Sequence, residues 1–189
     1  LHWNAIPVFA DIDEKTFNID PQSVIKNISK RTKAIQSVDI FGHSADMESL
    51  RAIADEYDLK LISDTAQSPG AFYKGKIAGT LADIGGYSLN YHKHIHTGEG
   101  GILVTNDPNL AERMQLIRNH AEAAVEGMKI NNIAIMLGHN FRLGEIEAAI
   151  GIEQIKKLDS FVESRRDCAE ILSEELKDIK EIQIPNVIH

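Results

Sequence analysis

The hydrophobic positions of this chain repeat with two different periods. Short apolar runs rich in β-branched residues predict strands, and apolar residues three or four positions apart predict amphipathic helices. Predicted strands span residues 6–12, 33–41, 59–64, 83–90 and 100–106. Predicted helices start at residues 21 and 45, between strands, and at residue 108, after the last strand. This alternation predicts βαβ units and therefore an α/β fold with a mainly parallel sheet.

Three predicted helices have recognisable local signals. Asp20 and Asp107 each precede a proline, which matches an N-cap residue followed by proline at the first helical position. The helix predicted over residues 45–58 carries its apolar residues on one face, which we expect to lie in the core. Those residues are Met47, Leu50, Ile53, Ala54 and Tyr57.

The C-terminal third has a different pattern. Residues 121–138 lack clear periodicity and are expected to form a loop, whereas residues 143–161 are helical and apolar on more than one side. A helix that is apolar nearly all round is buried in a core or at a subunit interface. A more polar helix is predicted over residues 162–176, and residues 181–189 have a strand-like pattern without a predicted partner strand.

Composition restricts the class of protein. The 189 residues are 43% hydrophobic and 25% charged, as in ordinary soluble proteins. A net charge of -8 without Lys/Arg runs argues against nucleic-acid binding, and no apolar run approaches the roughly 20 residues needed to span a membrane. Cys168 is the single cysteine, which excludes a disulfide framework. No signal-peptide pattern is visible, so we expect a cytoplasmic protein.

Residues 87–101, YSLNYHKHIHTGEGG, allow three kinds of site. His92, His94 and His96 alternate, so in an extended segment they could face one way and bind a metal ion. Their spacing matches no established metal motif, and ordinary loop histidines are the better interpretation. The glycine-rich TGEGG precedes a strand rather than a helix and matches no phosphate-binding motif, which favours a tight turn.

The third kind of site uses Lys93. A lysine at the mouth of a parallel sheet can be partly desolvated, which lowers its pKa and frees the amine for Schiff-base chemistry. Asp64 ends another predicted strand, at the edge of the sheet where ligands bind. Pyridoxal phosphate (PLP) needs a lysine for its aldehyde and a carboxylate for its pyridinium nitrogen. The residues alone are thus compatible with a PLP site. The alternative is that Asp64 only caps a helix or a turn.

A long stretch of the chain resembles a known family. LISDTAQSPGAFYKGKIAGTLADIGGYSLNYHKHIHTGEGGILVTND resembles the core of the DegT/StrS-type nucleotide-sugar aminotransferases, whose pattern is roughly D-A-A-Q-S/A-x-G-A, then S-F-x-x-x-K-x-x-x-x-G-E-G-G. FGHSADMESLRAIADEYDL and LGHNFRLGEIEAAIGIEQIKKLDSFVESRR resemble further family segments in the same order. The resemblance implies a PLP fold-type-I large domain, with three layers and a mainly parallel sheet flanked by helices.

The resemblance implies roles for five residues. Lys93 matches the lysine that bonds to the cofactor aldehyde and moves a proton between Cα and C4′, and Asp64 matches the aspartate paired with the pyridine nitrogen. Gln67 matches a glutamine near the ring and its 3-hydroxyl, and Ser88 a serine that hydrogen-bonds the phosphate. Asn140 matches an asparagine that reaches the phosphate in the neighbouring subunit, which implies a homodimer with shared active sites. Without the resemblance, a loop Gln, a strand-end Ser and a turn Asn would be the better interpretations.

The chain departs from the family pattern near these residues. None of the departures removes a required group, but the loop around Lys93 borders the sugar pocket, so they leave the substrate open. A related branch of pyridoxamine-phosphate-dependent sugar dehydratases has histidine in place of the lysine, so Lys93 favours amino transfer. The departures are Thr65 for Ala, Tyr91 and His92 for Pro and Thr, His94 after the lysine, and His139 for Tyr.

The resemblance as a whole implies a PLP-dependent aminotransferase that moves an amino group from an amino acid such as glutamate to a nucleotide-linked keto-deoxy sugar. The alternatives are a non-catalytic homologue or fragment that dimerises or regulates, a sugar dehydratase, and a histidine-cluster metal protein. Residues 1–159 are expected to form the central part of the large domain, and residues 160–189 a helix and strand leading into a truncated small domain. The family's phosphate loop would precede Leu1, so we expect this chain alone to bind PLP weakly or not at all.

Overall fold

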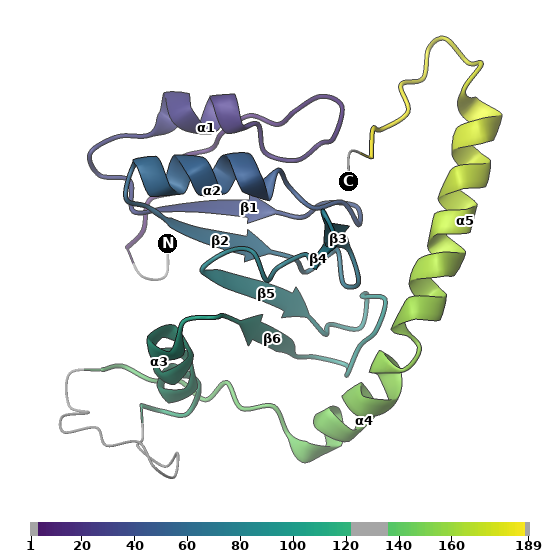
Figure 1. The fold of residues 1–189 in the computed structure, drawn as a ribbon. Coiled ribbons are helices and arrows are strands. Elements are labelled where there is room, and N and C mark those ends of the chain that lie inside the picture. The colour runs from purple at the N-terminus through teal and green to yellow at the C-terminus, as the bar shows by residue number, and fades with distance from the viewer. Residues whose placement is uncertain (1–3, 122–135, 188–189) are drawn as a thin grey trace.

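The computed structural model describes residues 4–121 and 136–187 of the chain. Figure 1 shows a sheet with helices around it and a long helical arm at the C-terminal end. The helices are α1 (Pro21–Asn27), α2 (Met47–Glu56), α3 (Pro108–Arg118), α4 (Glu145–Ile155) and α5 (Leu158–Leu176). The strands are β1 (Ala34–Val38), β2 (Lys60–Asp64), β3 (Phe72–Tyr73), β4 (Lys76–Ile77), β5 (Ile84–Ser88) and β6 (Gly101–Val104).

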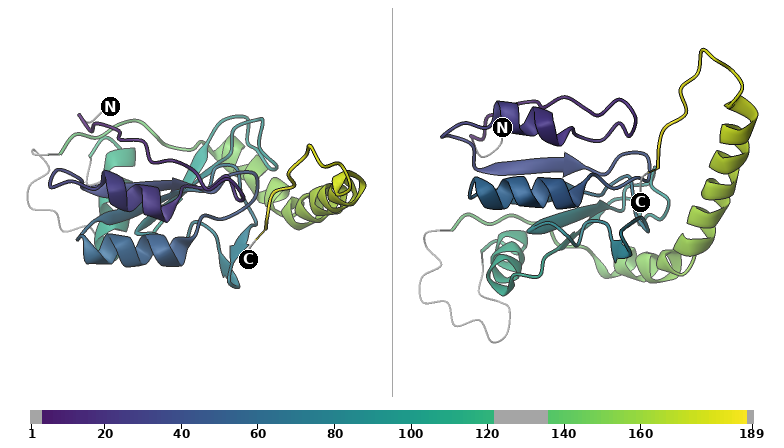
Figure 2. Two further views of the ribbon diagram at one scale, coloured as in Figure 1. Left: turned by 90° about the horizontal axis from the view of Figure 1, so that it is seen from above. Right: turned by 45° about the horizontal axis from the view of Figure 1, so that its top comes forward.

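Four strands form the central sheet in the order β1-β2-β5-β6. β1 pairs with β2 and β2 with β5 in parallel, while β6 runs antiparallel to β5. The register places Asp64 beside both Val38 and Gly86. The mainly parallel sheet with its helices confirms the predicted α/β fold, and β1, β2 and β5 end at the same edge (Figures 1 and 2).

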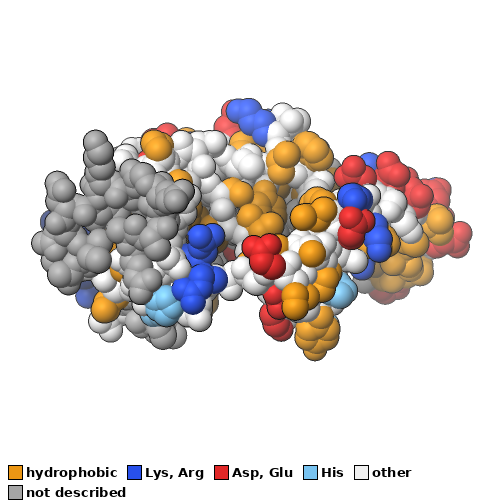
Figure 3. All heavy atoms as spheres, turned by 90° about the horizontal axis from the view of Figure 1, so that it is seen from below, with side chains coloured by type: hydrophobic (Ala, Val, Ile, Leu, Met, Phe, Trp, Pro, Cys, Tyr) orange, Lys and Arg blue, Asp and Glu red, His pale blue; other side chains and the backbone are white. Residues whose placement is uncertain are grey.

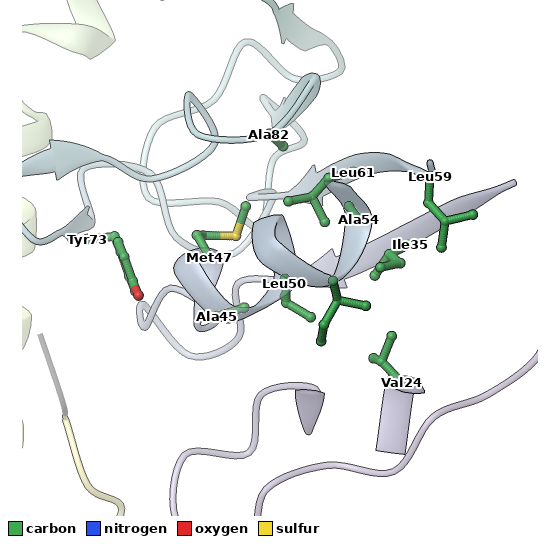
Figure 4. Close-up of a cluster of buried hydrophobic side chains, with 11 residues drawn as sticks. Val24, Ile35, Ala45, Met47, Leu50, Ala54, Leu59, Leu61, Tyr73 and Ala82 are labelled. Carbon is green, nitrogen blue, oxygen red and sulfur yellow. The ribbon is translucent and has the colours of Figure 1, made fainter. Parts of the chain in front are cut away.

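The hydrophobic core lies between α2 and one face of the sheet (Figure 4). Met47, Leu50, Ile53 and Ala54 of α2 are buried, as their predicted spacing on one face required. Alternate residues of the strands, such as Ile35 and Leu61, meet them from the sheet. The predicted fifth member, Tyr57, is 40% exposed, because the helix ends at Glu56 and Tyr57 is only its C-cap.

Local signals set the starts of two helices as predicted. The Asp20 carboxylate accepts hydrogen bonds from the backbone N–H groups of Gln22 and Ser23 at the start of α1. The Asp107 carboxylate likewise accepts from Asn109 and Leu110 at the start of α3. Each aspartate satisfies N–H groups that have no partner within the helix, so the helix begins at the following proline.

Two predicted strands are absent from the described residues. Residues 6–12 are not a strand: only Ile12 forms an isolated bridge, with Ile19, and the side chains of Val8 and Phe9 are exposed. Residues 181–187 also form no strand, although the Asn186 N–H donates to the Lys15 carbonyl. An apolar run becomes a strand only where a neighbouring strand offers backbone partners, and none of the described residues does so here.

A short hairpin was not predicted. β3 and β4 pair antiparallel around Lys74 and Gly75, which have φ angles of 46° and 77°. Two successive residues with positive φ are the geometry of a two-residue hairpin turn, and glycine accommodates the second without strain. Each of these strands has only two residues, which is too few for an alternation of apolar and polar residues to show in the sequence.

The apolar segment 143–161 forms two helices rather than one. α4 ends at Ile155 and α5 starts at Leu158, so the predicted final helix begins four residues earlier than Val162. No α4 side chain is buried among the described residues, and Ile146 is 76% exposed. Figure 3 shows hydrophobic side chains gathered on the face where α4 lies. Of the two predicted environments, burial in the core of this chain is therefore wrong, while a subunit interface stays a prediction.

Two further predictions concern a loop and a domain boundary in the second half of the chain. The loop predicted over residues 121–138 lies mostly outside the described residues. The division of the chain between residues 159 and 160 stays a prediction, with α5 running across it. Among the described helices, none has the length and apolar character that crossing a membrane requires.

Candidate functional site

The end of β2 directs Asp64 away from the core. Along this strand Leu61 and Ser63 are buried on the side of α2, and successive residues point to opposite faces. Asp64 therefore emerges on the face that α2 leaves uncovered. In the neighbouring strand Gly86 lies beside Asp64, and Ser88, two residues further on, ends β5 on the same face.

This face of the sheet holds an open depression of about 330 Å³. Asp64 and Ser88 both line it, together with Gly86 and Gly100. A side chain on Gly86 would come within 3.4 Å of Leu103, and one on Gly100 within 2.9 Å of Thr97. The absence of a side chain on Gly86 leaves space in the depression beside the Asp64 carboxylate and the Ser88 hydroxyl, whereas a side chain on Gly100 would crowd the loop around Thr97. The volume falls within the usual range of small-molecule sites.

A smaller cavity lies elsewhere. It has a volume of about 100 Å³ and is lined by Asp13, Asn18, His43 and neighbouring residues before α1 and α2. It contains none of the residues predicted from the sequence. The larger depression is therefore the one that concerns the predicted chemistry.

Gln67 lies three residues after Asp64 and connects two strand ends. Its side-chain oxygen Oε1 accepts a hydrogen bond of 2.8 Å from the backbone N–H of Phe41. This bond ties the loop after β2 to the loop after β1. Gln67 is placed close to Asp64 along the chain but does not line the depression.

Lys93 lies in a turn on the loop that follows β5. Its backbone N–H donates to the Asn90 carbonyl at 2.9 Å, and the Asn90 side chain bonds to Glu99 at 2.9 Å across the loop. α4 supports the same loop, because Gly151 leaves room for the Thr97 methyl group. Lys93 is half-buried, and within the described part of the chain its amine makes no hydrogen bond or ion pair. Lys93 thus lies on the loop that follows the end of β5, but it does not line the depression itself.

The three histidines of this loop do not converge. His92 is exposed and its ring lies 3.8 Å from that of Tyr91. His94 is half-buried, and burial first, then the charges of Arg165 and Lys93, lower its pKa. Among the residues that the structure describes, no three His, Cys, Asp or Glu side chains are placed to hold a metal ion. The geometry does not favour the histidine-cluster interpretation.

Asn140 is far from the other predicted residues within one chain. It is exposed and forms an isolated bridge with Asn119, directly after α3. α3 lies at the opposite end of the sheet from the strand ends where Asp64 and Ser88 lie (Figure 1). A role for Asn140 therefore requires a second copy of the chain, and it stays a prediction.

Asp39 was missed by the sequence reasoning. It follows β1 and is completely buried on the α2 side, next to the backbone of Asp64, whose carbonyl accepts a 2.9 Å hydrogen bond from the Asp39 N–H. A signal was present, because alternation from Ile35 places residue 39 on the buried face. A buried carboxylate is costly unless it is well hydrogen-bonded, so such a position marks a built polar site.

Comparisons with known proteins agree with one another. All 189 residues match the DegT/DnrJ/EryC1/StrS aminotransferase family. The chain is 40% identical to dTDP-3-amino-3,6-dideoxy-alpha-D-galactopyranose transaminase of Aneurinibacillus thermoaerophilus, over 92% of this chain and 47% of the relative.

Solved structures show the same likeness. Helicobacter pylori PseC, an aminotransferase involved in the biosynthesis of pseudoaminic acid, matches with a TM-score of 0.82 and 37% identity, covering 93% of this chain and 46% of that one. E. coli GDP-4-keto-6-deoxy-D-mannose-3-dehydratase with bound hydrated PLP matches with a TM-score of 0.80 and 35% identity, covering 90% and 47%. The chain spans about half the length of the curated relatives it matches.

Proposed function

The chain belongs to the DegT/DnrJ/EryC1/StrS aminotransferase family, and on this premise we propose that the whole protein is a PLP-dependent aminotransferase. It transfers an amino group from an amino acid such as glutamate to a nucleotide-linked keto-deoxy sugar. The observation that carries the proposal is the placement of Asp64 and Ser88 on one open depression, with Lys93 on the loop that follows β5. Named transaminases among the relatives support it.

The residues present fit PLP by their chemistry. The Asp64 carboxylate suits a protonated pyridine nitrogen, the Ser88 hydroxyl suits a phosphate oxygen, and Gly86 leaves space for a flat ring. When bound, PLP supplies an aldehyde that carries the amino group and a ring that withdraws electrons from the substrate. A relative of similar structure is described with bound hydrated PLP, which supports the same choice of cofactor.

Each residue has a distinct task in this proposal. Lys93 holds the cofactor through its amine and moves a proton between the substrate Cα and the cofactor C4′. Asp64 keeps the pyridine nitrogen protonated through its negative charge. From the resemblance we assign Gln67 to the ring hydroxyl, Ser88 to the phosphate, and Asn140 to the phosphate bound to a second copy.

A homodimer follows from the task of Asn140 and from α4. Isoleucines of α4 are exposed in the single chain, including Ile146 at 76% and Ile152 at 61%. A helix with such a surface suits burial against a partner, and a second copy is the partner that would also bring Asn140 to the site. We place the protein in the cytoplasm, which its single free cysteine, Cys168, fits.

A sugar dehydratase is the second candidate function. The similar E. coli dehydratase is the observation that favours it. Against it stands Lys93, since the resemblance associates the dehydratase branch with histidine at this position. A non-catalytic, dimerising homologue would keep α4 without using Lys93.

The test uses the full-length protein with Lys93→Ala and, as a control, Lys76→Ala. Lys76 is an exposed lysine of β4, outside the depression. Borohydride reduction should fix PLP to the wild-type and Lys76→Ala proteins but not to Lys93→Ala, which should also lose transamination. Transamination retained by Lys93→Ala would exclude the assignment, and sugar dehydration without amine transfer by the wild type would favour the dehydratase.

A further inference from the structure

Asp39 is a completely buried carboxylate that the proposed chemistry leaves without a task. Its oxygen Oδ1 accepts from the Ala45 N–H at 2.9 Å and from the Ser44 hydroxyl at 3.3 Å. Its oxygen Oδ2 accepts from the hydroxyls of Ser63 at 2.8 Å and Thr65 at 2.7 Å. Four donors on one buried carboxylate make a built polar site, in which the loss of any donor leaves buried charge less well satisfied.

Thr65 is one of the positions where the chain departs from its family pattern. The pattern has alanine there, which could not bond to Asp39. In this chain the Thr65 side chain is completely buried, and its hydroxyl makes the shortest of the four bonds to the Asp39 carboxylate. The hydroxyl that distinguishes Thr65 from alanine therefore has a hydrogen-bond partner, Asp39, which only the folded structure shows.

The two hydroxyls that bond to Oδ2 belong to the residues on either side of Asp64. Ser63 and Thr65 both point to the α2 side, so the Asp64 side chain between them must point to the depression. The backbone is held as well, since the Asp39 N–H donates to the Asp64 carbonyl at 2.9 Å and the Thr65 N–H donates to the Gly86 carbonyl at 2.8 Å. Residues 63–65 are thus fixed from both neighbouring strands.

The charge of Asp39 also acts on a side chain of β5. Tyr87 of this strand has a raised pKa because of burial first and the negative charge of Asp39 second. In the interior of a protein such an interaction is less screened than in water. The Tyr87 hydroxyl donates to the Ala78 carbonyl on the Thr65 side of the sheet, so this effect reaches the strand that lines the depression but not the depression itself.

We propose that Asp39 is a positioning residue for Asp64. Through the hydroxyls of Ser63 and Thr65 it fixes the direction in which the Asp64 carboxylate meets the pyridine nitrogen of the cofactor. This inference rests on the proposed function. A preorganised contact binds more tightly because the carboxylate loses less freedom when the cofactor arrives.

The test compares variants of the full-length protein that keep the size of the side chain. Thr65→Val removes the hydroxyl, and Thr65→Ser keeps it. Thr105→Val is the matched control, because the Thr105 hydroxyl donates at 2.6 Å to the Asp83 carbonyl, before the start of β5. We expect the PLP dissociation constant to rise about tenfold in Thr65→Val, or about 1.4 kcal/mol, and to stay unchanged in Thr65→Ser and Thr105→Val.

A second measurement needs no bound cofactor. Hydrogen exchange of the Asp64 and Thr65 backbone amides in the cofactor-free protein should be faster in Thr65→Val than in wild type and Thr105→Val. If Thr65→Val does not fold, Ser63→Ala, which removes the other hydroxyl on the same oxygen, replaces it with the same expected results.

The outcomes separate this inference from the function on which it rests. A wild-type protein that binds no PLP would overturn both. Normal wild-type binding, together with unchanged PLP affinity in a folded Thr65→Val protein, would overturn the positioning role alone. In that case a lower melting temperature of Thr65→Val than of wild type would show that the Thr65 hydroxyl only stabilises the fold.

Discussion

Replacing Ile146 of α4 by glutamate tests whether this helix forms the dimer interface. Ile146 is 76% exposed, and burying a whole isoleucine side chain contributes roughly 1.5–3 kcal/mol. Its exposed part is therefore worth roughly 1–2 kcal/mol per subunit. A twofold dimer contains each contact twice, so the loss is roughly 2–4 kcal/mol, or about 30- to 1000-fold in the dissociation constant. An unpaired carboxylate at the interface would add to this loss.

The variant should keep the fold of the subunit. Residue 146 lies in the first turn of α4, which already contains Glu145 and Glu147, and negative charge there is compatible with the helix dipole. Sedimentation equilibrium of the full-length protein over a range of concentrations measures the dissociation constant directly. Ile77→Glu is the control, since Ile77 is a 50% exposed isoleucine on β4.

The expected result is a shift to monomer in Ile146→Glu and wild-type association in Ile77→Glu. Wild-type association of a folded Ile146→Glu protein would refute the argument from exposed apolar surface. The dimer would then have to use a different face.

Two further predictions concern the core and the loop of Lys93. Leu50→Ala should lower the free energy of unfolding by about 3–5 kcal/mol in urea denaturation, because the Leu50 side chain of α2 is completely buried in the core; a loss below about 1 kcal/mol would contradict this packing. His94 should titrate below its ordinary pKa of 6.5 in NMR, and Arg165→Gln should move the midpoint upward. Since the unfolded chain binds this proton at higher pH, the contribution of His94 to stability is complete above pH 6.5 and declines as pH falls toward the lowered folded pKa; an unshifted midpoint would contradict its burial.

Local patterns in the sequence were sufficient for several elements. Asp20 and Asp107 each accept hydrogen bonds from residues two and three positions ahead, so the starts of α1 and α3 depend on a few neighbouring residues. The buried face of α2 follows in the same way from its spacing. Asp64 was placed at a strand end because an apolar run stops there, and the side chain does lie at that edge.

Other elements could not be predicted because they depend on distant partners. Residues 6–12 have the composition of a strand, yet the described structure provides no neighbouring strand for them. The α4 pattern allowed a core helix or an interface helix, and only its exposure distinguishes the two. The position of Asn140 away from the strand ends is likewise a property of the whole fold.

The sequence by itself determined the starts of the helices and the alternation of strands and helices. It also placed Asp64 and Ser88 at the ends of strands and Lys93 in the loop that follows Ser88. These depend on contacts within a few residues, which a local pattern expresses. Only the tertiary structure decided that Asp39 lies behind Asp64 and that Thr65 bonds to it, 26 residues apart along the chain. Such contacts arise because the register of β1 against β2 brings two strand ends together, and register is set by the packing of the whole sheet.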